Sequence, residues 1–162
     1  MQMVIRIRRN PYFIIGIASV LFTLLSLQLN WNDSLVALLS RLQWQTITGV
    51  AMVLVFVFQW TLFLHQQRKD VDAIPKSRFY HKYAGVLFVV LFALHAGIPG
   101  HTWMMILCAV AAALVLTGLF NREIVLFRRP WVYKIWLWLH VALAALMIPF
   151  VLMHILIALA FK

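Results

Sequence analysis

Long apolar stretches separated by short polar clusters run through the whole chain. A helix that crosses a bilayer needs about 17–25 mostly apolar residues, and the third stretch is the short one, ending at the helix-breaking run Gly97–Gly100. The pattern predicts an all-α integral membrane protein, a bundle of about five transmembrane helices that forms one domain over residues 1–162. The predicted spans are Pro11–Leu29, Thr46–His65, Tyr83–Ile98, Thr102–Phe120 and Tyr133–Phe161.

The composition supports the same class of protein. Hydrophobic residues make up 65% of the chain and charged residues only 11%, whereas soluble domains are about 45–50% apolar and about 25% charged. One core of this size could not bury so much apolar surface, which excludes most soluble enzyme folds and a disordered chain. The one cysteine, Cys108, excludes a scaffold held by disulfides within the chain.

Basic residues precede the first apolar stretch, as they do in a secretory signal peptide. The stretch is long, however, and the residues that follow it, Gln28–Trp31, contain no small-x-small cleavage pattern. We therefore expect a first span that is retained.

The net charge of +10 has two interpretations, nucleic-acid binding or membrane orientation. Twelve of the fourteen Lys and Arg residues lie before the first span, between the second and third, or between the fourth and fifth. Only Arg41 and Lys162 lie on the other side. Because cytoplasmic loops are enriched in Lys and Arg, we expect a cytoplasmic N-terminus, an outer C-terminus, membrane lipid as the partner of the basic loops, and no nucleic acid.

The acidic residues all fall in predicted loops. Ion-coupled transporters usually keep an ionisable carboxylate inside the membrane, so their distribution argues against a small transporter for a metal or organic ion. The four residues are Asp33, Asp70, Asp72 and Glu123.

Four histidines form two pairs with equal spacing. His81 and His95 are 14 residues apart, and so are His140 and His154. On an α-helix this interval brings the second side chain back to within about 40° of the first and about 21 Å along the axis. The third and fifth spans run in the same direction, so His81 is expected to face His140 at the cytoplasmic level. His95 is expected to face His154 at the outer level.

Two facing imidazoles at each of two depths fit a b-type haem, whose iron takes one axial ligand on each side of a flat ring. A structural zinc site needs four ligands in one place. The sequence therefore predicts two haem b groups, held by the pairs His81–His140 and His95–His154. A protein with one haem stays open, as does a haem-free anchor or assembly subunit of a larger complex, in which the histidines only pack.

These pairs resemble the ferric reductase-like transmembrane domain family, found in NADPH oxidases, metalloreductases and the haem subunit of the bacterial methionine sulfoxide reductase system. The resemblance covers Phe79–Phe161, and the first two spans match only by hydropathy. It implies a dihaem electron-transfer subunit of an oxidoreductase in a bacterial-type inner membrane, working within a hetero-oligomer. No glycine-rich dinucleotide fingerprint occurs, so we expect an external donor, a quinol or a flavoprotein, and an acceptor protein on the outer side.

Other polar residues are secondary candidates. Arg78, Lys82 and Lys134 lie at the cytoplasmic ends of the ligand helices and could pair with haem propionates, or could simply follow the positive-inside rule. His65 could contact a quinol or a propionate, and His101 lies where an acceptor would approach; interfacial anchoring is the alternative for both. No catalytic residue is assigned.

Overall fold

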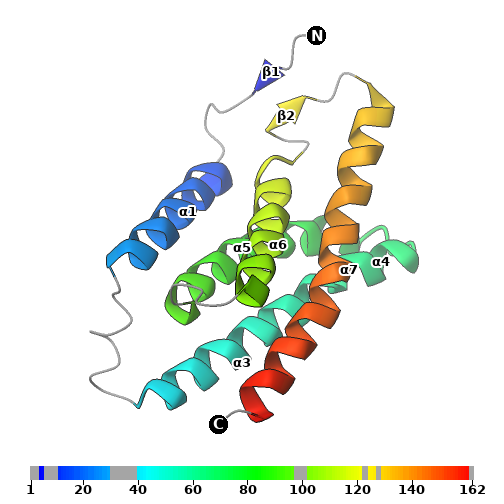
Figure 1. Ribbon diagram of the computed structural model, residues 1–162. Coiled ribbons are helices and arrows are strands. Elements are labelled where there is room, and N and C mark those ends of the chain that lie inside the picture. Colours follow the sequence, from blue (N-terminus) through cyan, green and yellow to red (C-terminus); the bar gives the residue numbers. More distant parts are fainter. Residues whose placement is uncertain are drawn as a thin grey trace. The chain divides into compact units, whose positions relative to one another are not determined.

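A computed structural model gives the fold of this chain and describes residues 4–5, 11–29, 40–96, 102–121, 124–126 and 129–160. This part is α-helical apart from one pair of two-residue strands (Figure 1). Its elements are β1 (Val4–Ile5), α1 (Pro11–Leu29), α3 (Arg41–Gln59), α4 (Thr61–Gln67), α5 (Ala73–His95), α6 (Thr102–Leu119), β2 (Val125–Leu126) and α7 (Pro130–Ala160).

Four helical stretches of the described chain are long and apolar enough to cross a membrane. This confirms the predicted helical, multi-pass membrane protein at that level. The stretch formed by α3 and α4 counts as one, because Trp60 joins the two helices in a right-handed helical conformation. The four stretches are Pro11–Gln28, Leu42–Gln67, Thr102–Leu119 and Pro130–Ala160.

Helix α5 differs from the predicted third span, Tyr83–Ile98. It is not one of the four apolar stretches, and it begins ten residues earlier, at Ala73. Its polar first half, with Lys76 and Lys82, was expected to be a loop, and that expectation is wrong. The charged half lowers the mean hydropathy of the helix, and the apolar part that remains is short.

The starts of α3 and α5 follow from local polar chemistry. Ser40 and Gln43 form a capping box at α3: the Ser40 Oγ accepts from the Gln43 N–H at 3.3 Å, and the Gln43 Oε1 accepts from the Ser40 N–H at 3.1 Å. Ahead of α5, the Asp70 Oδ1 accepts from the Ala73 N–H at 3.1 Å. Pro75 lies in the first turn of α5, where its missing N–H costs little.

The described helices divide into two compact units. The first unit spans Pro11–Ile98, and the second joins Met1–Asn10 to Pro99–Lys162. In the first unit, α5 packs against α1, α3 and α4.

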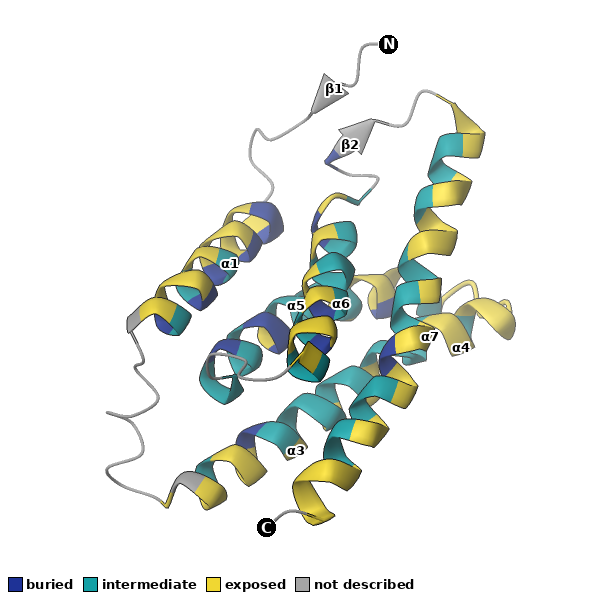
Figure 2. Cartoon of the chain, in the orientation of Figure 1, coloured by how far each residue is buried: buried dark blue, intermediate teal, exposed yellow. Residues whose placement is uncertain are grey.

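One face of α1 is buried (Figure 2). It includes the hydroxyl residues Ser19, Thr23 and Ser26. Ser19, Thr23 and Ser26 each donate to the carbonyl four residues earlier, at 2.7–2.9 Å. Thr23 also lies 3.3 Å from the Val89 carbonyl of α5. Small hydroxyl residues satisfy their own polar atoms and let two helices approach closely.

In the second unit, α6 packs against α7. Trp103 and Phe150 stack with ring centroids 4.8 Å apart, and Met147 is 2% exposed. Strands β1 and β2 pair antiparallel, with Val4 opposite Leu126.

We predict that Ser19→Leu destabilises the protein by about 1–3 kcal/mol, because the extra methylenes must enter a closely packed helix interface. Thermal unfolding of the full chain in detergent, followed by circular dichroism, measures the loss. Ala18→Leu is the matched control, since Ala18 is the exposed neighbour on the same helix. Equal melting temperatures for the two variants would contradict the assigned face of α1.

Candidate functional site

His81 and His95 lie on one continuous helix. Helix α5 runs without interruption from Ala73 to His95, and both imidazoles are partly buried. The two residues therefore lie about 21 Å apart along one helix axis. His95 is the last residue of the helix, and the chain is extended at Ala96.

His140 and His154 likewise share helix α7, which continues past Pro149 between them. Both side chains are partly buried. Helix α5 belongs to the first unit and α7 to the second. Each unit thus supplies one histidine pair, and the matching of a ring from α5 with a ring from α7 stays a prediction.

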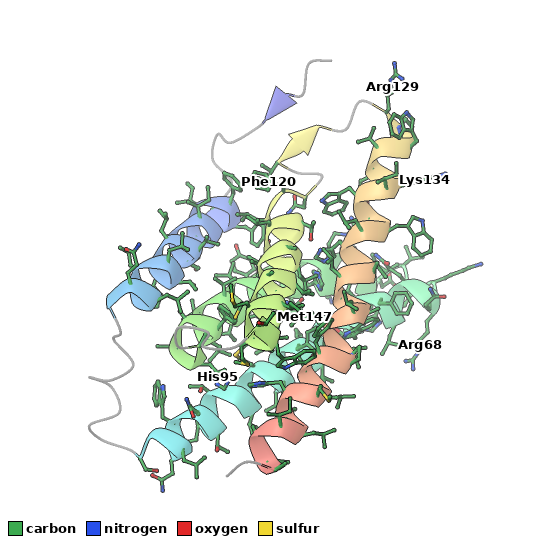
Figure 3. All side chains as sticks on the ribbon, viewed as in Figure 1. Arg68, His95, Phe120, Arg129, Lys134 and Met147 are labelled. Carbon is green, nitrogen blue, oxygen red and sulfur yellow. The ribbon has the colours of Figure 1, made fainter. Side chains whose placement is uncertain are left out.

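The His95 ring is held against helix α3. Its Nδ1 lies 3.0 Å from the Thr48 Oγ1, and Figure 3 shows His95 at the end of α5. The next residue, Gly49, lies beneath the ring: a Cβ added there would be 3.1 Å from the His95 Cε1. Trp44, one turn before Thr48, donates from Nε1 to the Leu94 carbonyl at 2.9 Å. An alanine at position 49 would therefore push the ring away from α3 by a few tenths of an ångström.

The His140 ring is held in the same way against helix α6. Its Nδ1 lies 2.9 Å from the Thr117 Oγ1, and a Cβ added at Gly118 would be 3.3 Å from its Cε1. Trp136, one turn before His140, stacks on the imidazole with centroids 5.9 Å apart and planes 9° apart. The Trp136 Nε1 also donates to the Thr117 carbonyl at 3.0 Å. Three neighbours thus fix this ring.

These two arrangements, called here the Thr-Gly cradles, consist of Thr48-Gly49 with His95 and Thr117-Gly118 with His140. The sequence contains only these two Thr-Gly pairs, and each lies against a histidine. Sequence reasoning missed all four residues. The repeated dipeptide in two apolar segments was the available signal, but 47 residues separate Thr48 from His95, so the contact depends on how the helices pack.

His81 is bound differently, through Gln59 at the end of α3. The His81 Nδ1 lies 3.1 Å from the Gln59 backbone carbonyl. The Gln59 amide covers the same region of α5: with its nitrogen turned to α5 it donates to the His81 carbonyl at 3.0 Å, and its oxygen accepts from the Gly85 N–H at 2.8 Å. Gly85 leaves room for this amide, because a Cβ there would be 3.3 Å from the amide atom that faces it, which is the oxygen in this orientation.

The predicted propionate partners lie near two of the histidines along the chain. Arg78 and Lys82 are within one turn of His81 on α5, the first exposed and the second partly buried. Lys134 is exposed, six residues before His140, and Figure 3 shows it near the start of α7. The positions suit anionic groups at the ends of the ligand helices, and the pairing itself stays a prediction.

His65 belongs to the connection between α4 and α5. Its Nδ1 lies 3.5 Å from the Asp70 Oδ2, and Lys69 takes a left-handed conformation there with φ of 54°. The Asp70 N–H donates to the His65 carbonyl at 3.1 Å, a closure typical of helix C-termini. This supports a structural role at the turn. His101 lies outside the described residues.

The described histidines do not gather into a cluster of metal ligands. In the ranges that the structure describes, no three His, Cys, Asp or Glu side chains gather as a metal site. Each of His81, His95 and His140 has Nδ1 next to a helix oxygen, the contact that ligating histidines typically make with their second nitrogen. Glycines at the backs of two rings fix how the imidazoles lie.

No family model matches the chain, and neither the curated proteins nor the solved structures contain a match to it.

We predict that Trp136→Phe destabilises the protein by about 0.5–1.5 kcal/mol, because the Nε1 bond to the Thr117 carbonyl is lost while an aromatic ring is kept. Chemical unfolding of the full chain in detergent measures the change. Trp138→Phe serves as the control, since Trp138 is 72% exposed on the same helix. A loss as large in Trp138→Phe as in Trp136→Phe would show that the bond is not the cause.

Proposed function

We propose that this chain is a dihaem b-type cytochrome, the membrane subunit that carries electrons from a cytoplasmic or quinol donor to an acceptor on the outer side. One observation carries the proposal. Two histidine pairs with the same spacing of 14 residues lie on two continuous helices of a multi-pass membrane protein.

His81 and His140 would hold the inner haem, and His95 and His154 the outer one. This assignment rests on the parallel directions of α5 and α7 that the charge distribution predicts. When bound, a haem supplies reversible one-electron chemistry at its iron. The chain would supply the imidazoles that hold the iron and the contacts that orient them.

The distribution of charge supports electron transfer over ion transport. Helices α1, α3, α5, α6 and α7 contain no Asp or Glu, whereas a transported ion usually needs a carboxylate in the membrane. Arg78, Lys82 and Lys134 are the candidates to neutralise the propionates of the inner haem.

The resemblance to the ferric reductase-like family supports the rest of the proposal. What the resemblance implies is a chain in a bacterial-type inner membrane, with its N-terminus in the cytoplasm, as part of a hetero-oligomeric oxidoreductase. The electron donor is then a quinol or a flavoprotein, and the acceptor is a partner protein on the outer side.

A haem-free anchor subunit is the rival function. In such a protein the histidines only pack, and the hydrogen bonds at His95 and His140 would serve stability alone. The two functions differ in one property that can be measured directly, the haem bound per chain.

We predict that the purified chain shows b-type bands in its reduced-minus-oxidised spectrum and binds two haems. His95→Ala and His154→Ala each remove one haem, because an axial ligand is lost. The double variant His95→Ala/His154→Ala loses no more than either single variant, since both residues would hold the same iron. The double variant His95→Ala/His140→Ala loses both haems. A pyridine haemochrome assay and a redox titration measure the content.

His65→Ala is the control, because His65 lies in the α4–α5 turn, and it keeps both haems. A wild-type chain without b-type bands would overturn the proposal in favour of the anchor. Unchanged haem content in both His95→Ala and His154→Ala would also overturn it. Loss of both haems in His95→Ala/His154→Ala would show that the pairing is wrong.

A further inference from the structure

We propose that Thr48 and Thr117 are positioning residues, one for each haem, whose hydroxyl oxygens hold the protonated Nδ1 of His95 and His140 and so leave Nε2 of each ring to bind iron. The inference rests on the proposed function. It goes further by naming the residues that set the protonation form and direction of one ligand in each pair.

The hydrogen bonds of the two threonines determine which atom carries the proton. A hydroxyl has one hydrogen to donate. The Thr48 Oγ1 lies 2.8 Å from the Trp44 carbonyl, an acceptor only, and 3.0 Å from the His95 Nδ1. When the hydroxyl donates to the nearer carbonyl, its oxygen is left as an acceptor. The His95 Nδ1 must then be the donor, and the lone pair of the neutral ring is on Nε2.

The Thr117 hydroxyl leads to the same result for the second ring. Its Oγ1 lies 2.9 Å from the Leu114 carbonyl and 3.0 Å from the Ala113 carbonyl, both acceptors. The His140 Nδ1 lies 2.9 Å from the same oxygen. Because both carbonyls only accept and the hydroxyl has one hydrogen, which it donates to them, the ring takes the role of donor. The lone pair of His140 is therefore also on Nε2.

The glycines complete each cradle by setting the position of the ring. A Cβ at Gly49 or Gly118 would lie 3.1 Å or 3.3 Å from the Cε1 of its imidazole, which is closer than ordinary van der Waals contact. Cε1 is the atom between the two ring nitrogens. Contact with the helix at Cε1 and the hydrogen bond at Nδ1 together set the orientation of the ring. They therefore also set the direction in which Nε2 points.

The two cradles are at opposite ends of their helices. Thr48 is near the start of α3 and meets the last residue of α5, whereas Thr117 is near the end of α6 and meets the first part of α7. With the orientation that the basic loops predict, the first cradle lies at the outer level and the second at the inner level. Each proposed haem thus receives one ligand whose direction a cradle fixes.

Substitution of each threonine by valine tests the inference, because valine keeps the shape and removes the acceptor. A hydrogen bond to Nδ1–H makes an axial imidazole a stronger donor to iron, so its loss raises the midpoint potential. We expect Thr48→Val to raise the potential of one haem, Thr117→Val that of the other, and the double variant to raise both. Each single variant lowers the affinity of its haem about 10- to 100-fold.

Two matched variants separate this role from a general loss of stability. Thr48→Ser and Thr117→Ser keep the hydroxyl and restore the wild-type potentials. Thr46→Val removes the same kind of bond, to the Leu42 carbonyl at 2.8 Å, from an exposed site on α3, and it leaves both potentials unchanged. Wild-type potentials in Thr48→Val and Thr117→Val would overturn the inference. So would equal shifts in Thr46→Val.

A second measurement tests the protonation form without haem. Nitrogen NMR of the full chain labelled with ¹⁵N-histidine, prepared without haem and assigned with His95→Gln and His140→Gln, reports which ring nitrogen bears the proton. We expect Nδ1–H in both rings, and a mixture of the two forms for His95 in Thr48→Val. A wild-type chain that binds two haems but carries the proton of His95 on Nε2 overturns this inference alone. A chain that binds no haem overturns the proposed function, whatever the NMR result.

Discussion

A polar side chain on an apolar helix needs a hydrogen-bond partner within reach, because the hydrocarbon around it offers none. Several hydroxyls of the described helices meet that requirement within their own helix. Ser19, Ser26, Thr46 and Thr48 each donate to the carbonyl four residues earlier. A hydroxyl that has donated its hydrogen can still accept a hydrogen bond through its oxygen. Where a second helix packs against it, this oxygen can pair with a donor on that helix.

The histidines are the groups that meet this second requirement. An imidazole buried among apolar residues needs a hydrogen-bond partner or a ligand for each of its two nitrogens. At His95 and His140 a threonine oxygen takes one nitrogen, and at His81 the Gln59 carbonyl does so. The same bond therefore satisfies a polar atom and, in the function proposed above, decides which nitrogen would bind the haem iron.

Much of the fold follows from local sequence. Helix α1 has the predicted bounds, because Pro11 begins it and the apolar run sets its length. The early start of α5 also had local signals, the acidic residue Asp72 and then Pro75, typical of a helix N-terminus. The predicted span followed hydropathy instead, and hydropathy marks only the apolar part of a helix and not its polar first turns.

The strands and the cradles could not be predicted in this way. Strands β1 and β2 are two residues long and pair through backbone atoms, so no alternation of side chains marks them. For the histidines, spacing alone indicated which residues share a helix face. It did not indicate Thr48 or Thr117, because those contacts depend on the register between two packed helices. Both threonines look like ordinary residues of an apolar segment.

The two histidine helices, α5 and α7, differ in the backbone between their histidines. Helix α5 is unbroken between His81 and His95. A rotation of this helix about its axis would therefore turn both rings by the same angle, which is about 100° for a shift of one residue in helix register. Helix α7 has Pro149 between its histidines, where one backbone bond is absent and bending is easiest. A bend at Pro149 would change the direction of His154 and leave His140 in contact with Trp136 and Thr117.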